Sequence, residues 1–320
     1  VSPGTYSCGV ENSVRDLTMK GGTYSWSSMP LDGSTAPSLA QRQAIGKLTY
    51  DVGVASQMNY TRNSSGTWGA ITIVALKERF GYASARSCWC YHERKGLNEM
   101  AKNAILGSLD AGMPVAVGLG GSAGGHEVVL DGYGYSFGTP YIHMNCGWSG
   151  SENLWYNIMG EAVTHFEFSY LDEIGYNIHP SERGEVISGR VQDESGKGVA
   201  GAQVVLVTPS GSRLSAESGG TGIYSFRVTE SGSYGLSASG GGKESDAVTV
   251  DMRVTTGNFT ATKTGQAFNL SDSDGEVGNR WGVDLTLKFG SKGKVTVAGT
   301  ADGVKVSAKS QVLPMAWVGA

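Results

Sequence analysis

The sequence predicts an α+β domain, with helices ahead of antiparallel strands, followed by an all-β sandwich. Apolar residues recur with a helical period between residues 38 and 114, and the pattern then changes to short strands that end near residue 180. From residue 184 onward, short alternating strands recur between turn signals, as in a sandwich. We therefore expect an α+β domain over 1–180, a β-sandwich over 184–252, and a β-rich region over 253–320 that is either a further domain or part of one.

Composition narrows the class of protein. The 320 residues include 49 glycines and only 17% charged residues, so Gly, Ser and Thr replace Lys and Glu at the surface. This pattern is typical of exported bacterial proteins, and we expect a secreted or cell-surface protein. The net charge is -4 and the Lys and Arg residues are scattered, which argues against a nucleic-acid partner. No apolar run approaches the ~18 residues of a membrane-spanning helix.

Helices are predicted in the first half of the chain, after a short β region. TYSCGV and VRDLTMK are expected to pair as a hairpin across ENS. A first helix begins at Ser38 and ends near Gly53, and two more are expected at 69–81 and 97–114. One face of the first helix carries Leu39, Ala44, Ile45 and Leu48.

Strands follow the third helix. PVAVGLG at 114–120, HEVVLDGYG at 126–134 and PYIHMNCGW at 140–148 are strand-like and separated by glycine turns. Near the end of the chain, Asp302-Gly303 is predicted to be a hairpin tip. The acidic stretch SDSDGEVGN at 271–279 lacks the full pattern of a calcium loop, so an ordinary turn is expected there.

The candidate chemistry lies in two of these strands. His126 follows two glycines, which let a substrate approach the backbone closely, and it is a credible general base. Asn145 is a credible orienting residue, because its amide oxygen can accept the imidazole N–H, and Trp148 can shield that bond from water. In the plainer alternative, His126 is a half-buried strand histidine and Asn145 belongs to a turn. Asp131 is a rival orienting residue, although its Gly-rich surroundings favour a turn.

The four cysteines, Cys8, Cys88, Cys90 and Cys146, do not form a framework. Cys88 and Cys90 are one residue apart, which suits neither a disulfide between them nor a zinc pair. We therefore expect no metal site and no cofactor.

Several motifs, in order, resemble the streptopain family of secreted bacterial cysteine peptidases, from about Tyr24 to Ile158. They are AIGKLTYDVGVASQMNY, GTWGAITIVALKERFGY, GGHEVVLDGYG and YIHMNCGWSG. The resemblance implies a papain-like α+β fold, with His126 as the base, Gly125 lining the substrate cleft, and Trp148 packing by the histidine. It places Ser65 and Gly66 in a loop that contacts substrate, more weakly because the residues there differ. Cys146 replaces the first tryptophan of the family's N-W-G-W motif, which changes the local shape.

The nucleophile is the missing part of this pattern. The family's catalytic cysteine opens a helix in a G-C-x-A-T-A-like stretch, and a helix N-terminus lowers the pKa of a thiol. No such stretch occurs here, and Cys8, the only cysteine upstream of the motifs, is not followed by A-T-A. We expect the nucleophile to lie upstream of Val1, so that the chain is a catalytically incomplete C-terminal portion.

The sequence thus predicts part of a secreted cysteine endopeptidase that acts on proteins or peptides. The resemblance implies broad specificity, with an apolar side chain preferred two residues before the cleaved bond, and a propeptide in the precursor. GRVQDESGKGVAGAQVVL and TGIYSFRV resemble the carboxypeptidase regulatory-like, or transthyretin-like, β-sandwich modules of secreted enzymes, over about 186–252. Two alternatives stay open: a non-catalytic surface or adhesion protein that retains the fold, and a thiol amidase or transglutaminase-like enzyme.

Overall fold

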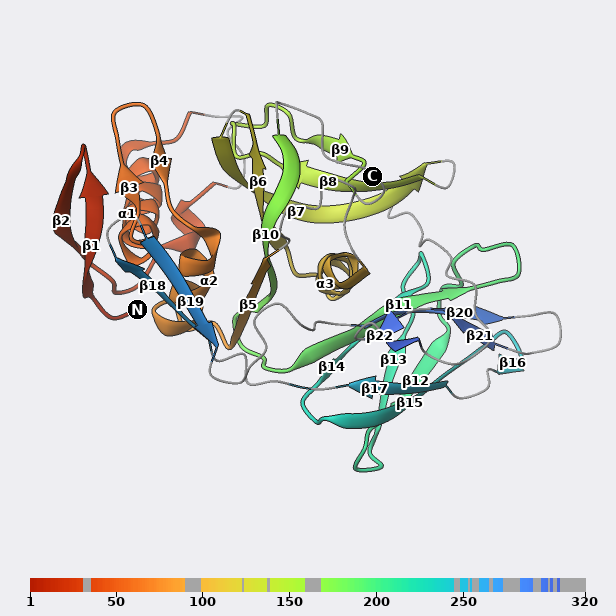
Figure 1. Cartoon of the computed structure of the whole chain (residues 1–320). Helices are drawn as coiled ribbons and strands as arrows, with labels where there is room; N and C mark the ends of the chain where they lie inside the picture. The colour runs from red at the N-terminus through yellow and green to blue at the C-terminus, as the bar shows by residue number, and fades with distance from the viewer. Residues whose placement is uncertain are drawn as a thin grey trace.

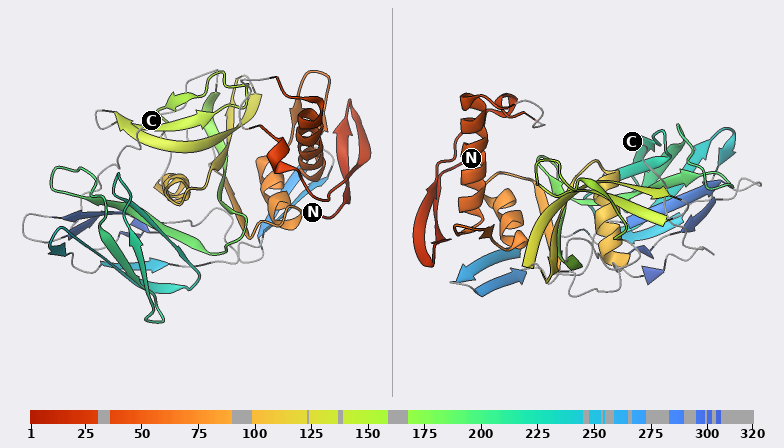
Figure 2. Two further views of the ribbon diagram at one scale, coloured as in Figure 1. Left: turned by 180° about the vertical axis from the view of Figure 1, so that it is seen from behind. Right: turned by 90° about the horizontal axis from the view of Figure 1, so that it is seen from above.

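A computed structural model describes most of the chain. The described residues are 1–30, 36–89, 99–122, 124–136, 139–158, 168–244, 248–252, 254, 259–264, 267–272, 283–289, 295–298, 300–301 and 304–305. A helical N-terminal part, a central sheet and a C-terminal sandwich follow one another in space as they do in the sequence (Figure 1). The views from behind and from above agree that the central sheet lies between the other two parts (Figure 2).

The N-terminal part combines a small sheet with one long helix. Strands β1 (Gly4–Val10) and β2 (Ser13–Met19) form the predicted antiparallel hairpin, and β3 (Asn59–Tyr60) and β4 (Ser65–Gly66) extend the sheet from β1. A short 3-10 turn, η1 (Trp26–Ser28), precedes helix α1 (Leu39–Ala55). Ser38 and Gln41 form a capping box at the start of α1, which fixes the point where the helix begins.

Asp51 ties the loop after β2 to helix α1. It is fully buried, and its carboxylate accepts hydrogen bonds from the backbone N–H of Lys20 and Gly21 and from the hydroxyl of Tyr24. Lys47, one helical turn earlier, forms an ion pair with it at 3.1 Å. These partners keep the pKa of Asp51 below its ordinary value although burial acts in the opposite direction.

The central sheet has six strands in the order β5-β10-β6-β7-β8-β9, and every neighbouring pair is antiparallel. The strands are β5 (Ser84–Trp89), β6 (Val115–Gly121), β7 (Gly124–Ser136), β8 (Thr139–Asn145), β9 (Leu154–Tyr156) and β10 (Phe168–His179). Helices α2 (Gly69–Glu78) and α3 (Glu99–Asp110) pack against this sheet.

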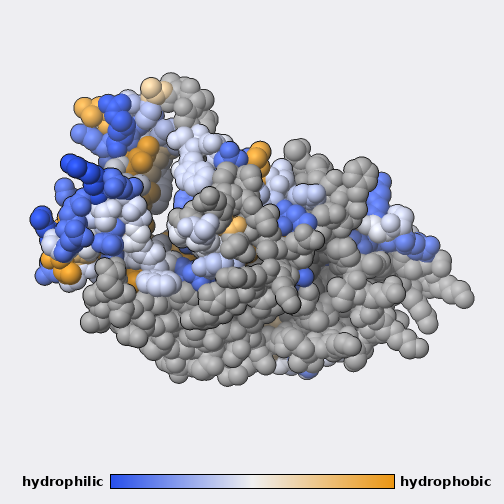
Figure 3. All heavy atoms as spheres, turned by 45° about the horizontal axis from the view of Figure 1, so that its top comes forward, coloured by the Kyte–Doolittle hydropathy of each residue, from blue (hydrophilic) through white to orange (hydrophobic). Residues whose placement is uncertain are grey.

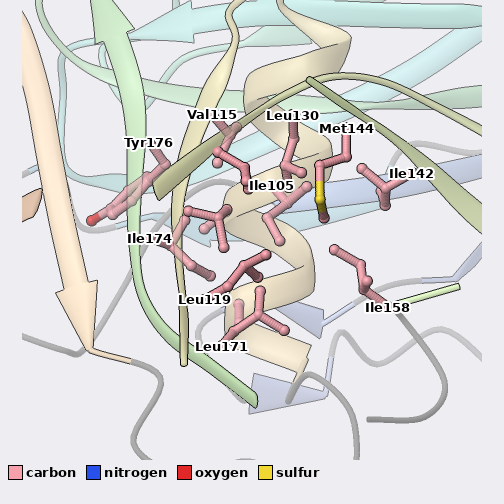
Figure 4. Close-up of a cluster of buried hydrophobic side chains, with 14 of the residues drawn as sticks. Ile105, Val115, Leu119, Leu130, Ile142, Met144, Ile158, Leu171, Ile174 and Tyr176 are labelled. Carbon is pink, nitrogen blue, oxygen red and sulfur yellow. The ribbon is translucent and has the colours of Figure 1, made fainter. Parts of the chain in front are cut away.

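The two helices cover opposite faces of β10. Successive side chains of a strand point to opposite faces. Ile174 belongs to the buried cluster around α3. The next residue, Gly175, faces α2, and Ile73 of α2 occupies the space that a side chain at this position would need. In Figure 4, side chains from α3 and the sheet, among them Ile105, Leu130 and Ile142, point toward one another and form the core of this part.

The C-terminal part is a sandwich of two sheets. One has the order β14-β11-β20-β21, and the other has the order β13-β12-β15-β16 with β17 paired to β15. The strands are β11 (Glu185–Gln192), β12 (Gln203–Val207), β13 (Arg213–Glu217), β14 (Ile223–Val228), β15 (Gly232–Gly240), β16 (Lys243–Glu244), β17 (Val248–Met252), β20 (Val283–Phe289) and β21 (Val295–Ala298). Two hairpins complete the described strands: β18 (Phe259–Thr264) with β19 (Ala267–Asp272), and β22 (Thr300–Ala301) with β23 (Val304–Lys305).

The structure confirms the predicted N-terminal hairpin, the three helices and the strands at 114–148, with shifts of a few residues at their ends. Helix α1 continues two residues past Gly53, the end that the sequence suggests. Strand β5 is not among the predicted elements. Cys90, the hairpin tip at Asp302-Gly303 and most of the acidic stretch 271–279 lie outside the described residues.

Candidate active site

A cleft of about 1000 Å³ lies between α1, the loop before α2, and the end of the β6–β7 hairpin with β10. Ser65, Gly66, Gly125 and His126, which are far apart in the sequence, all line it. In the space-filling view, a hollow lies beside the coloured residues of the N-terminal helical part (Figure 3). Four of the six site residues predicted from the sequence therefore share one cleft.

His126 is held by packing on its ring and by one hydrogen bond. Its imidazole stacks on Trp148, with ring centroids 4.7 Å apart and an interplanar angle of 25°, and on Phe168 at 6.0 Å. Nε2 lies 2.8 Å from the backbone oxygen of Cys146. Because a carbonyl only accepts, Nε2 carries the proton in this arrangement, and Nδ1 of the neutral ring has the lone pair that a general base needs.

Asn145 lies one residue before that carbonyl, at the end of β8. Its Oδ1 accepts a hydrogen bond from the backbone N–H of Gly147 at 2.9 Å, and Gly147 has a φ of 72°, in the region that favours glycine. The side chain of Asn145 thus shapes the turn that presents the Cys146 carbonyl to the imidazole. A direct hydrogen bond from His126 to Asn145 stays a prediction.

The three described cysteines are buried and lie outside the cleft lining. Cys8 is in a separate cluster with Met19 and Val54, and its Sγ faces the backbone oxygen of Val54 at 3.8 Å. Burial and the nearby charge of Glu152 raise the pKa of the Cys146 thiol, which is the opposite of what an activated nucleophile needs.

Asp131, the rival orienting residue, lies next to a different histidine. Its Oδ1 is 2.5 Å from Nδ1 of His143, whose ring also contacts Trp155 at 5.1 Å between centroids. His179 accepts hydrogen bonds from the backbone N–H groups of Ser181 and Glu182 at the end of the sheet. Neither histidine lines the cleft, so His126 is the histidine among the described lining residues.

Three acidic residues that line the cleft were not singled out from the sequence: Glu127 on β7, and Asp172 and Glu173 on β10. Glu127 and Glu173 approach each other beside Gly69 and Gly118. Burial raises the pKa of Glu173 to about 7. Glu127 is exposed to the cleft. Partial loss of hydration, with the charges of Glu173 and Asp172, raises its pKa to about 8.

Sequence signals for these carboxylates existed. Glu127 interrupts the apolar run after His126, and Asp172-Glu173 lie between the apolar residues Leu171 and Ile174. An acidic residue inside a strand is unusual unless it lies at a site or has a partner. What the sequence lacked was the pairing of β7 and β10 with β6, which brings them together.

Within the described ranges, no group of three or more His, Cys, Asp and Glu side chains has the arrangement of a metal site. No described helix has the length and apolar character needed to cross a membrane.

Comparison with known proteins identifies two regions of the chain. Residues 2–156 match the Peptidase C10 family, and residues 186–264 match the carboxypeptidase regulatory-like domain. Both regions correspond to the resemblances seen in the sequence. With the observed order of helices, antiparallel sheet and β-sandwich, they confirm the predicted fold class.

Relatives with known names are proteases. Streptopain of Streptococcus pyogenes serotype M28 is 31% identical over 127 residues, which is 40% of this chain and 31% of streptopain. The thiol protease/hemagglutinin PrtT of Porphyromonas gingivalis is 32% identical over 133 residues, or 42% of this chain and 15% of PrtT. The solved interpain A cysteine protease of Prevotella intermedia shares 22% identity at a TM-score of 0.47, covering 55% of this chain and 74% of that structure. The chain spans about a third of the length of the streptopains that it matches.

Proposed function

We propose that the chain, whose residues 2–156 match the Peptidase C10 family, supplies the general base and the substrate cleft of a secreted bacterial cysteine endopeptidase. The observation that carries this proposal is the setting of His126. Its ring stacks on Trp148, and Nε2 forms a hydrogen bond with the backbone carbonyl of Cys146. The residue also lines a cleft large enough for several residues of a peptide. This leaves Nδ1 to exchange a proton with a nucleophile.

In the proposed reaction, a cysteine thiol transfers its proton to Nδ1 of His126, giving a thiolate–imidazolium pair. The thiolate attacks the carbonyl carbon of a peptide bond, and the imidazolium then protonates the leaving amine. Water, deprotonated by the same imidazole, hydrolyses the acyl-enzyme and restores the thiol. Gly125 and the Ser65-Gly66 loop line the groove in which the substrate lies.

The nucleophile in this proposal is a cysteine N-terminal to Val1, at the start of a helix that lowers its pKa. The burial of Cys8 and Cys146 away from the cleft lining supports this assignment over a nucleophile at either residue. Protein or peptide substrates follow from the reaction type. In this proposal the region over 184–252 spaces the enzyme or attaches it to substrate, and a propeptide precedes the mature enzyme.

Catalysis by His126 is tested with the natural protein extended upstream of Val1. His126→Ala should lower kcat for casein or peptide hydrolysis by at least about 10⁴-fold, because the thiol is then neither deprotonated nor able to protonate the leaving group. His143→Ala, in the same sheet, is the matched control and should keep near-normal turnover. The reverse order would show that the base has been misassigned.

The upstream sequence separates the alternatives. Ser, Ala or Gly in place of the expected cysteine would support the non-catalytic surface protein. Transfer of acyl groups to added amines faster than hydrolysis would support the transglutaminase-like enzyme.

The 320-residue chain alone should show no thiol-dependent hydrolysis. Hydrolysis that Cys8→Ser abolishes would place the nucleophile at Cys8.

A further inference from the structure

The cleft gathers acidic side chains. Its lining includes Glu127, Asp172 and Glu173 but neither Lys nor Arg within the described residues. Single acidic residues at a surface are ordinary. Here, however, Glu173 is only 4% exposed, and a buried carboxylate is costly unless it has partners.

Glu173 has a partner for only part of its carboxylate. It accepts hydrogen bonds from the backbone N–H groups of Gly69 and Ala70, the first residues of α2, where the helix dipole also favours a negative charge. Its Oε2 is buried and has no hydrogen-bond partner among the described residues. The helix N-terminus therefore compensates one oxygen of Glu173 and leaves the other unsatisfied.

Glu127 brings a second carboxylate to the same place. A methyl group added at Gly69 would overlap Oε1 of Glu173 and lie 3.1 Å from Oε1 of Glu127, so both oxygens face one point. At Gly118, such a group would lie 3.3 Å from Oε2 of Glu127 and 3.1 Å from Cγ of Glu173. Two residues without side chains thus make the room in which the carboxylates meet.

We propose that Glu127 and Glu173 form a subsite for the guanidinium or ammonium group of an arginine or lysine side chain in a peptide bound in the cleft. A planar guanidinium can donate to two carboxylates at once, and a single cation between them removes their mutual repulsion. A divalent metal ion fits less well, because no third His, Cys, Asp or Glu among the described residues joins the two carboxylates. This subsite rests on the proposed peptidase function, since the cation is taken to belong to a substrate.

The preference for a basic side chain differs from the apolar preference that the family resemblance implies. Glu127 directly follows His126 on β7, so the subsite adjoins the proposed base while facing the α2 side of the sheet. The raised pKa values of Glu127 and Glu173, about 8 and about 7, agree with two like charges that lack a counterion. A bound cation should lower both.

The test compares peptides that differ only in charge. Arginine and citrulline have nearly the same shape, so blocked tetrapeptides of alanine with one or the other at each position are titrated into the 320-residue chain at pH 8.5. Binding is followed by NMR. At one position, the arginine peptide should bind at least about tenfold more tightly than its citrulline partner. Equal affinity at every position would overturn the proposal and mean that the two carboxylates share a proton instead.

Substitutions locate the effect. Glu127→Gln and Glu173→Gln should each reduce the preference for arginine over citrulline to below about threefold. The glutamine oxygen at 173 can still accept from Gly69 and Ala70, so this variant should fold. Glu217→Gln, an exposed residue of the sandwich, removes the same charge elsewhere and should leave the preference unchanged. If Glu217→Gln reduces the preference as much as Glu127→Gln does, the attraction is a property of the net charge and the subsite is wrong.

Binding does not need the nucleophile, so the two proposals can fail separately. Discrimination by the 320-residue chain without hydrolysis by the upstream-extended enzyme would support the subsite and overturn the peptidase. Hydrolysis with equal kcat/KM for arginine and citrulline peptides at all positions would support the peptidase and overturn the subsite.

Discussion

At the scale of single residues, the main finding is that a backbone carbonyl engages the imidazole. Cys146 supplies that oxygen, and two asparagines hold the backbone of Cys146 and of the next residue, Gly147. Asn145 bonds the N–H of Gly147, and Oδ1 of Asn153 accepts from the N–H of Cys146 at 3.0 Å. A carbonyl held in this way can orient the proposed base without a side chain that titrates.

Asn145 is therefore expected to act as a positioning residue. In the upstream-extended enzyme, Asn145→Ala should lower kcat by up to about a hundredfold, since a small displacement of the base costs this much, and KM should change little. Asn153→Ala and Trp148→Ala should resemble it, because each loosens the support of the imidazole. The measurement is kcat and KM over a pH range, with Thr5→Ala on the exposed hairpin as the control. A loss as large as that of His126→Ala would instead indicate a direct role in proton transfer.

At the scale of elements, the contact between helix α1 and the chain after β2 depends on one buried side chain. Asp51→Ala removes the acceptor for Lys20, Gly21 and Tyr24 together and leaves buried donors unsatisfied. Each such donor costs about 1–3 kcal/mol, so we expect a loss of about 3 kcal/mol or more in the free energy of unfolding. Urea denaturation measures it. Asp16→Ala is the control. Asp16 is an exposed residue of β2 that accepts a hydrogen bond from Ser7, and its loss should change the free energy of unfolding by less than about 0.5 kcal/mol. A similar effect of both variants would contradict this role.

The sequence predicted the local elements well, because their signals are local. The start of α1 at Ser38 and the turn between β1 and β2 are both determined by residues that are adjacent in the sequence. Strand β5 was missed because its alternation is short and interrupted by Arg86, a buried cation whose partner, Glu185 at 2.5 Å, lies far along the chain.

Features that depend on distant pairing could not be predicted. Strand β20, from the predicted region 253–320, pairs in parallel with β11 and so lies in the same sheet as the start of the sandwich. The meeting of Glu127 with Glu173 has the same origin. The resemblance to a known family, by contrast, indicates which distant residues share the cleft. It therefore allowed the prediction of four lining residues: Ser65, Gly66, Gly125 and His126.

At the scale of the whole molecule, buried acids connect the peptidase part to the sandwich. Asp110 at the end of α3 accepts hydrogen bonds from Tyr133 of β7 and from Ser188 of β11. Burial outweighs these bonds and the charge of Arg190, and it raises the pKa of Asp110 to about 7. Ionisation of this side chain above that pH therefore places a charge at the contact between the two parts.

Stability should accordingly fall as the pH rises from about 4.5 to about 8. Asp110, Glu127 and Glu173 all have folded-state pKa values above their ordinary ones, so in this range the folded protein binds more protons than the unfolded chain. Their stabilising effect is complete below the ordinary values and is lost as the pH approaches about 7 to 8. Asp51 has a lowered pKa and acts in the opposite sense, but its contribution changes only below its ordinary value of 3.8, outside this window.

Urea unfolding at pH 5, 6, 7 and 8.5 measures this dependence. The combined variant Asp110→Asn, Glu127→Gln, Glu173→Gln should lose most of it, because amides do not titrate, whereas Glu217→Gln should retain it. Stability that rises between pH 5 and 8.5 in the unmodified chain would show that these carboxylates are ionised and paired in the folded state.

An arginine peptide supplies such a pairing from outside, so it should raise stability at pH 8.5 more than at pH 5, whereas the citrulline peptide should not. The pH profile and the charge preference of the cleft therefore test the same pair of carboxylates by independent measurements.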